Sequence, residues 1–122
     1  MQQTLSASIY GNVQGVSFRA YVQKFARNLK LTGFVENKKN GSVKVVAIGK
    51  EEDLKKLLEV LHTGPLFAKV VDVVYDFGDE NGNFDTFEVK RNGNYFVDQF
   101  NAYFWFVKNF FKYETKKRHS RN

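Results

Sequence analysis

The chain changes from a strand-like stretch to a helical pattern over Gly11-Asn12-Val13-Gln14-Gly15-Val16-Ser17-Phe18-Arg19. The two glycines allow this segment to bend sharply and let its backbone approach another group closely. The first N–H groups of the helix that follows have no partners within the helix, so they are available to an anion. The segment therefore predicts a phosphate site where the first strand meets the first helix.

Apolar residues on either side of this segment predict the elements that it joins. Residues 5–11 alternate between apolar and polar side chains, as in a strand with one buried face. The helical spacing after the junction is carried by Val22, Phe25, Ala26 and Leu29. We expect Gly33 to end this helix, because glycine commonly follows the last helical turn.

Further along, the sequence predicts a hairpin, a second helix and two more strands. The hairpin signal is Asn40-Gly41, which separates two stretches rich in β-formers. The second helix begins near Glu51 and ends at Thr63-Gly64-Pro65. The expected strands are 34–37, 42–48, 67–77 and 84–90. The order β-α-β-β-α-β with a short extra strand predicts an α+β, two-layer sandwich in which two helices cover one face of the sheet.

Size and composition favour one small domain. The chain has 122 residues and no cysteine, which excludes disulfides, a thiol nucleophile and cysteine-ligated metals. The amino terminus lacks the basic and apolar regions of a secretion signal. The longest apolar run, 102–107, is far shorter than the roughly 20 residues that cross a bilayer. We therefore expect a soluble, cytoplasmic protein.

Residues 92–122 differ from the rest of the chain. Aromatic side chains recur there at steps of three and four residues, which predicts an amphipathic helix. Four basic residues follow, Lys116, Lys117, Arg118 and Arg121, so the net charge of +6 belongs mainly to this end. We expect a folded domain in 1–91 and an aromatic helix with a basic tail in 92–122.

Three roles are open for residues 92–122. The segment could pack on the sheet face that a two-layer fold leaves bare or pair with a second copy, and we favour this structural role. It could instead lie on an anionic membrane surface. Contact with nucleic acid is the least supported, because the aromatic residues follow helical spacing rather than lying on exposed strands.

Two spaced motifs resemble those of the acylphosphatase family. The first lies within 9–19, where the matching residues are Gly11, Val13, Gln14, Gly15, Val16, Phe18 and Arg19. The second is Gly33-Phe34-Val35-Glu36-Asn37, followed by Gly41, Val43 and Gly49. The similarity covers roughly residues 5 to 91, and the family's ferredoxin-like fold agrees with the order of elements predicted above.

The resemblance implies hydrolysis of a carboxylic–phosphoric mixed anhydride to carboxylate and inorganic phosphate, without a metal or cofactor. It assigns phosphate binding to Arg19 and the attacking water to Asn37. The backbone N–H groups around the phosphate would come from Gln14, Gly15, Val16, Ser17, Phe18 and Arg19. These roles suit the residue types, because a guanidinium donates paired hydrogen bonds to phosphoryl oxygens and an amide both accepts from and donates to water. The implied partner is a small acyl phosphate.

Two features of the sequence bear on this chemistry. His62 and His119 are poorly placed for a catalytic base, but an acyl phosphate has a good leaving group, so positioning and charge stabilisation can supply most of the catalysis. Glu36 precedes Asn37 at a position where the family usually has a basic or neutral residue. Because neighbours on a strand face opposite ways, we expect Glu36 to face away from the phosphate, whereas a bulge would bring its negative charge close.

The same fold is also compatible with functions other than hydrolysis. One alternative is a regulatory module that binds phosphate or an acyl phosphate without turnover. Another is an RNA-binding module that uses the sheet, although we expect no nucleic-acid partner. Steep salt dependence of binding would mark the RNA module.

Overall fold

The computed structural model describes residues 2–79 and 84–91. The amphipathic helix expected within 92–122 lies outside the described residues. The described elements, in chain order, are β1 Gln2–Asn12, α1 Phe18–Asn28, β2 Thr32–Asn37, β3 Val43–Lys50, α2 Glu51–Thr63, β4 Lys69–Gly78 and β5 Phe87–Lys90. Neither of these helices is long and apolar enough to cross a membrane.

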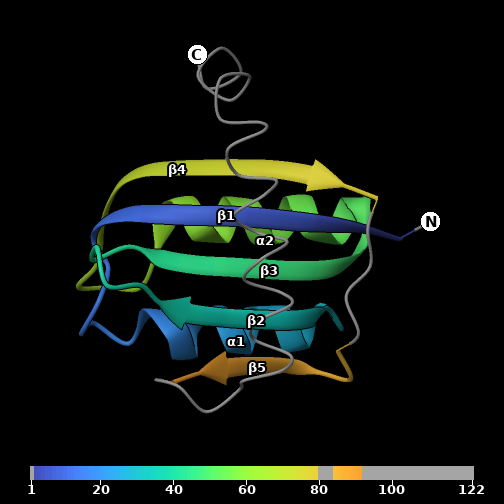
Figure 1. Cartoon of the computed structure of the whole chain (residues 1–122), viewed down its shortest axis with the longest axis horizontal. Coiled ribbons are helices and arrows are strands. Elements are labelled where there is room, and N and C mark those ends of the chain that lie inside the picture. Colours follow the sequence, from blue (N-terminus) through green and yellow to red (C-terminus); the bar gives the residue numbers. More distant parts are fainter. Residues whose placement is uncertain (1, 80–83, 92–122) are drawn as a thin grey trace.

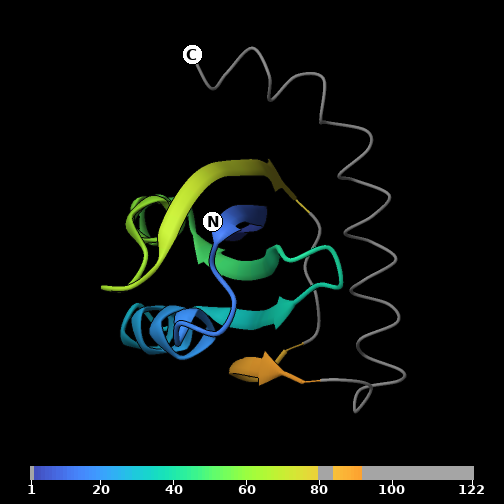
Figure 2. The ribbon, with the colours of Figure 1, turned by 90° about the vertical axis from the view of Figure 1, so that its left-hand side faces the viewer.

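The strands form one five-stranded sheet in the order β4-β1-β3-β2-β5. Both helices lie against the same face of this sheet, behind it in Figure 1 and to its left in Figure 2. The predicted ferredoxin-like sandwich with a short extra strand is therefore confirmed for the described residues.

Strand directions bring three strand ends to one edge of the sheet. β1 and β2 both pair antiparallel with β3, and β5 pairs parallel with β2. The carboxyl ends of β1, β2 and β5 therefore lie together, on the left in Figure 1. The loop that leads from β1 into α1 leaves from this same edge. In open α/β sheets, ligands commonly bind where the carboxyl ends of strands meet a helix.

The core lies between the sheet and the two helices. In β1, the alternating residues Leu5, Ala7 and Ile9 are completely buried, as the sequence pattern predicts. The helices bury matching apolar stripes, Val22 and Ala26 from α1 and Leu54, Leu57 and Leu61 from α2. Burying each large aliphatic side chain stabilises the fold by about 1.5–3 kcal/mol, which fixes the helices against the sheet.

The expectation that Gly33 ends the first helix is wrong. α1 ends at Asn28, and Lys30 takes the left-handed conformation with a φ of 60°. The Lys30 N–H donates to the Arg27 carbonyl and the Leu31 N–H to the Ala26 carbonyl, which is the Schellman pattern of a helix end. Gly33 lies within β2, where a side chain would collide with the backbone of Val46 on β3. Close packing of two strands, rather than a helix stop, explains this glycine.

Candidate active site

The loop between β1 and α1 bends through two residues with positive φ. Gly15 has a φ of 75° and Ser17 a φ of 65°. The left-handed region is uncommon for a residue with a side chain, so Ser17 holds a conformation that costs free energy. When residues with positive φ alternate with residues of negative φ, as at Gly15 and Ser17, successive backbone N–H groups turn toward one concave side, where an anion can bind.

The N-terminus of α1 has no negative side chain of its own. Ser17 is the N-cap residue, but its hydroxyl makes no capping hydrogen bond, and the first turn contains no acidic residue. By contrast, the first turn of α2 contains Glu51, Glu52 and Asp53, which offset the positive end of that helix. The two N-termini therefore differ, and only α1 leaves its first N–H groups and partial positive charge available to a bound anion.

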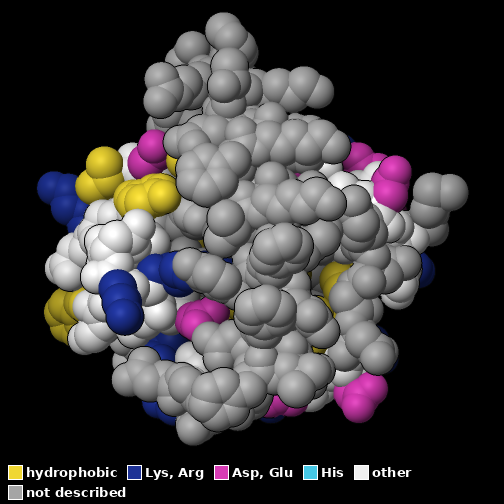
Figure 3. Space-filling view, viewed as in Figure 1, with side chains coloured by type: hydrophobic (Ala, Val, Ile, Leu, Met, Phe, Trp, Pro, Cys, Tyr) yellow, Lys and Arg dark blue, Asp and Glu magenta, His cyan; other side chains and the backbone are white. Residues whose placement is uncertain are grey.

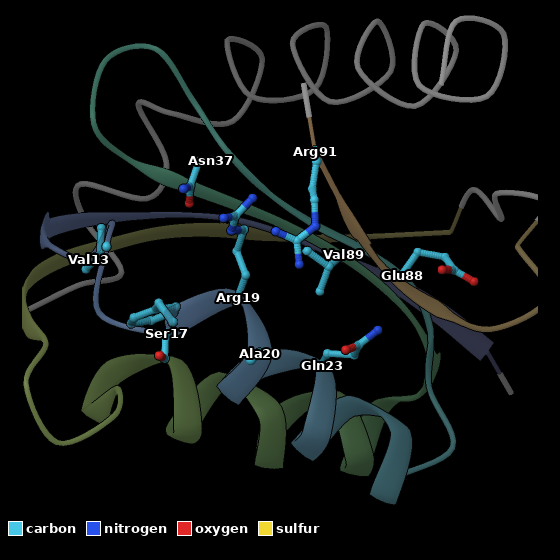
Figure 4. A pocket seen from close by; sticks show the side chains of 11 residues that line it. Val13, Ser17, Arg19, Ala20, Gln23, Asn37, Glu88, Val89 and Arg91 are labelled. Atoms are coloured by element: carbon cyan, nitrogen blue, oxygen red, sulfur yellow. The ribbon is translucent and has the colours of Figure 1, made fainter. Parts of the chain in front are cut away.

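A cavity of about 520 Å³ opens in front of this N-terminus. Its lining comes from the loop, from α1 and from the ends of β2 and β5, and consists of Val13, Gly15, Ser17, Phe18, Arg19, Ala20, Gln23, Asn37, Glu88, Val89 and Arg91 (Figure 4). A smaller cavity of about 270 Å³ shares Arg19, Asn37 and Arg91 and adds Glu36 and Lys90. The predicted catalytic pair, Arg19 and Asn37, thus lies at one site although 18 positions separate the two residues in the sequence.

Arg19 extends from the first turn of α1 toward the middle of the larger cavity (Figure 4). Among the described residues, its guanidinium forms no ion pair and no hydrogen bond. A half-buried guanidinium without a protein partner keeps all its donors for a bound anion. In the space-filling view, Lys and Arg side chains also show on the left side of the molecule, where β1, β2 and β5 end (Figure 3).

Asn37 ends β2 and faces Arg19 across the cavity (Figure 4). Its Oδ1 is buried, and within residues 2–79 and 84–91 it accepts no hydrogen bond. A buried acceptor of this kind costs free energy unless water or a ligand satisfies it. The position of this oxygen is therefore suited to a bound water molecule.

Gln14 ties the loop to the hairpin between β2 and β3. Its Nε2 donates to the carbonyl oxygens of Lys38 at 2.7 Å and Ser42 at 2.9 Å. The hairpin is itself closed by Asn40, whose Oδ1 accepts from the N–H of Ser42 at 3.0 Å. Because Asn37 directly precedes this hairpin, the Gln14 amide holds the loop and Asn37 in a fixed relation.

Glu36 faces the sheet side opposite the helices. β2 pairs with β3 without a bulge from Thr32 to Asn37, so Glu36 and Asn37 point in opposite directions. The Glu36 carboxylate lies 3.1 Å from the Nζ of Lys44, whose side chain is completely buried. Burial lowers the pKa of Lys44 from 10.5 to about 7, although the Glu36 carboxylate raises it. Glu36 still borders the smaller cavity, with Lys44 beside it to compensate its charge.

The predicted site residues divide into those that line the larger cavity and those that do not. Gly15, Ser17, Phe18, Arg19 and Asn37 line it. The side chain of Gln14 instead binds the hairpin, and that of Val16 packs against the core. His62 lies at the end of α2, where its Nδ1 is 2.9 Å from the Leu58 carbonyl oxygen, and it lines neither cavity. Across the described ranges, no group of three or more metal-binding side chains comes together.

Sequence reasoning missed Arg91, Gln23 and Val89. Phe87 and Val89 face the helices, and Arg91 continues this alternation one residue beyond the end of β5. The alternation of side chains along 87–91 predicts that Arg91 shares a face with Phe87 and Val89. This alternation places Arg91 beside Asn37 only when the parallel pairing of β5 with β2 is known.

Comparisons with known proteins agree with this geometry. The family model described as Acylphosphatase matches residues 5–89. An acylphosphatase of Salinibacter ruber is 41% identical over 90 residues, which cover 74% of this chain and 95% of that protein. One of Thermus thermophilus is 45% identical over 78 residues, covering 64% and 89%.

Solved structures give the same result. The acylphosphatase from Bacillus subtilis superposes with a TM-score of 0.71 at 33% identity, covering 75% of this chain and 100% of that chain. The acylphosphatase from Coxiella burnetii gives a TM-score of 0.69 at 35% identity, covering 73% and 93%. The chain therefore belongs to the acylphosphatase family.

Proposed function

We propose that this member of the acylphosphatase family hydrolyses acyl phosphates to carboxylate and inorganic phosphate, with Arg19 holding the phosphoryl group and Asn37 the attacking water. The observation that carries these two roles is the shared cavity. A guanidinium and an amide oxygen that lack partners within residues 2–79 and 84–91 border the same space as the N-terminus of α1, which has no side-chain cap.

The phosphoryl oxygens would bind at the N-terminus of α1. The backbone N–H groups of residues 14–19 donate to them from one side, and the Arg19 guanidinium donates two charge-assisted hydrogen bonds from the other. These donors are fixed in place before the substrate binds, so they stabilise charge in the transition state without reorganising.

Asn37 would orient the water for attack on phosphorus. Its Oδ1 accepts a hydrogen bond from the water, which fixes the direction of the water's lone pair. The new bond joins the water oxygen to phosphorus, the bond from phosphorus to the acyl oxygen breaks, and the carboxylate leaves. The proton of the water passes to an oxygen of the substrate, so the site needs no histidine.

Phosphate release from benzoyl phosphate tests these roles. We expect Arg19→Gln and Asn37→Ala each to lower kcat/KM by at least about a hundredfold, because each removes interactions that strengthen in the transition state. Arg19→Gln should also strongly weaken inhibition by inorganic phosphate, whereas Asn37→Ala should leave it nearly unchanged. Lys24→Gln is the control, since Lys24 is an exposed cation on the same helix that lines neither cavity.

The outcomes separate catalysis from mere binding. Full activity in Arg19→Gln would refute the role of the guanidinium. Binding of phosphate by the unmodified chain, without measurable hydrolysis of benzoyl phosphate, would instead select the non-catalytic phosphate-binding module.

We also propose that residues 92–122 cover the sheet face opposite the helices. Phe34, Val46 and Ile48 give that face a buried apolar strip, and neither α1 nor α2 lies against it. The aromatic side chains of residues 96–111 recur at the spacing of one helix face, which suits them to cover such a strip. An oligomer formed through the same aromatic segment and a membrane surface are the competing roles.

A further inference from the structure

A second arginine lies in the candidate active site. Arg91 follows the end of β5, and it borders both cavities together with Arg19 and Asn37. In Figure 4 its guanidinium points into the cavity beside that of Arg19. Arg91 comes from a different element than Arg19, so the cavity has cationic groups on two walls.

The cavity extends beyond the space that a phosphoryl group needs. Gln23 lies one helical turn, about 6 Å, beyond Arg19 along α1, and therefore away from the loop that would hold the phosphate. The Nε2 of Gln23 donates to the Phe87 carbonyl at 3.2 Å, which fixes this wall against β5. Cavities of roughly 300–1,000 Å³ hold small organic ligands, and at about 520 Å³ this one has room for an acyl group as well.

Arg91 has no partner of its own within the described part of the chain. It makes no ion pair or hydrogen bond there. Glu88 borders the same cavity, but its carboxylate points away from both guanidinium groups (Figure 4). The nearby Glu36 is 3.1 Å from Lys44. Two neighbouring cations that lack an acidic partner among the described residues favour a ligand with more than one negatively charged group.

We propose that Arg91 binds an anionic group on the acyl part of the substrate, so that the site prefers acyl phosphates whose acyl group carries a second negative charge. This inference rests on the proposed function, because it assumes that the phosphoryl group occupies the Arg19 end of the cavity. The acyl group then extends from Arg19 toward Gln23 and Val89, and it passes Arg91, which donates charge-assisted hydrogen bonds to its anionic group (Figure 4).

The test compares benzoyl phosphate with its 3-carboxy and 4-carboxy derivatives. These substrates share the reacting group and the ring, and they differ in one carboxylate and its distance from phosphorus. We expect at least one carboxylated substrate to show a kcat/KM about tenfold higher than benzoyl phosphate, mainly through a lower KM. In Arg91→Gln this preference should vanish, so that the ratio of kcat/KM for the carboxylated substrate to kcat/KM for benzoyl phosphate falls to about one. Arg91→Lys should recover part of the preference, and Lys24→Gln should retain all of it.

A binding measurement keeps the inference testable if the chain does not turn over benzoyl phosphate. Phenylphosphonate and its carboxylated derivatives cannot be hydrolysed at the carbon–phosphorus bond, and calorimetric titration gives their Kd values. Tighter binding of a carboxylated compound that depends on Arg91 would support the inference even if hydrolysis failed. An equal loss for all compounds in Arg91→Gln would place the guanidinium on the phosphoryl group and overturn the inference, as would no loss at all.

Discussion

At the scale of single residues, the site depends on which charges are compensated. Arg19 and Arg91 have no acidic partner among the described residues, whereas Glu36 has Lys44. Alternation along β2 predicts this division, because it sends Glu36 and Asn37 to opposite faces. The sequence could not predict the identity of the compensating cation, since Lys44 meets Glu36 only through the register of β2 with β3.

The lowered pKa of Lys44 predicts how stability depends on pH. The pKa of Lys44 is about 7 in the folded chain, and in the unfolded chain it takes its ordinary value of 10.5. Between pH 7 and 10.5, the unfolded chain therefore binds more protons than the folded chain. The free energy of unfolding should therefore rise with pH over this range, by up to about 1.4 kcal/mol per pH unit. Urea unfolding between pH 7 and 9 should show this rise in the unmodified chain and a flatter profile in Lys44→Met. Parallel profiles would contradict the burial of this cation.

At the scale of elements, local patterns predicted the kinds of helices and strands, but not all of their ends. The loop at 11–19 and the hairpin at Asn40-Gly41 were predicted because their glycines act through short-range backbone geometry. The pattern around Gly33 does not predict the role of this glycine, because the close approach of β3 arises only in the folded sheet. The actual end of α1 uses Lys30, a residue type that gives no strong stop signal.

The strained end of α1 can be improved by one substitution. Lys30 is exposed and holds a φ of 60°, which costs a residue with a side chain about 1–2 kcal/mol. Lys30→Gly should therefore stabilise the chain by about 0.5–1 kcal/mol, after the greater flexibility of unfolded glycine is subtracted. Lys24→Gly, in the middle of the same helix, should destabilise it by about 1 kcal/mol. Denaturant midpoints that fall equally in both variants would refute the assigned helix end.

At the scale of the whole molecule, the sequence predicts the fold and the part of the candidate site that contains the loop, Arg19 and Asn37. Arg19 and the loop are contiguous, and Asn37 belongs to a second motif. The sequence does not predict the place of Arg91, because this place depends on the parallel pairing of β2 with β5, the last strand in the sheet order. The pairing of β5 with β2 thus determines which residues form the wall of the cavity that we assign to the acyl group.

Removal of the carboxyl-terminal segment tests the proposed role of residues 92–122. A chain that stops after Gly93 keeps Arg91 away from the new terminal carboxylate. It should retain benzoyl phosphate hydrolysis, because no residue after 91 is assigned to the site. It should melt several degrees lower, since it would leave the apolar strip around Phe34 exposed. Unchanged melting together with unchanged gel-filtration elution would contradict a packed segment.

Titration of the ¹⁵N-labelled chain with inorganic phosphate tests the central claim most directly. A phosphate held by the N-terminus of α1 and the Arg19 guanidinium should shift the backbone amide signals of residues 14–20 and the Nε–H signal of Arg19, saturating together with one Kd. The same titration of Arg19→Gln should show these shifts only at much higher phosphate concentration. Shifts confined to other parts of the chain, or identical titrations of the two proteins, would contradict the account.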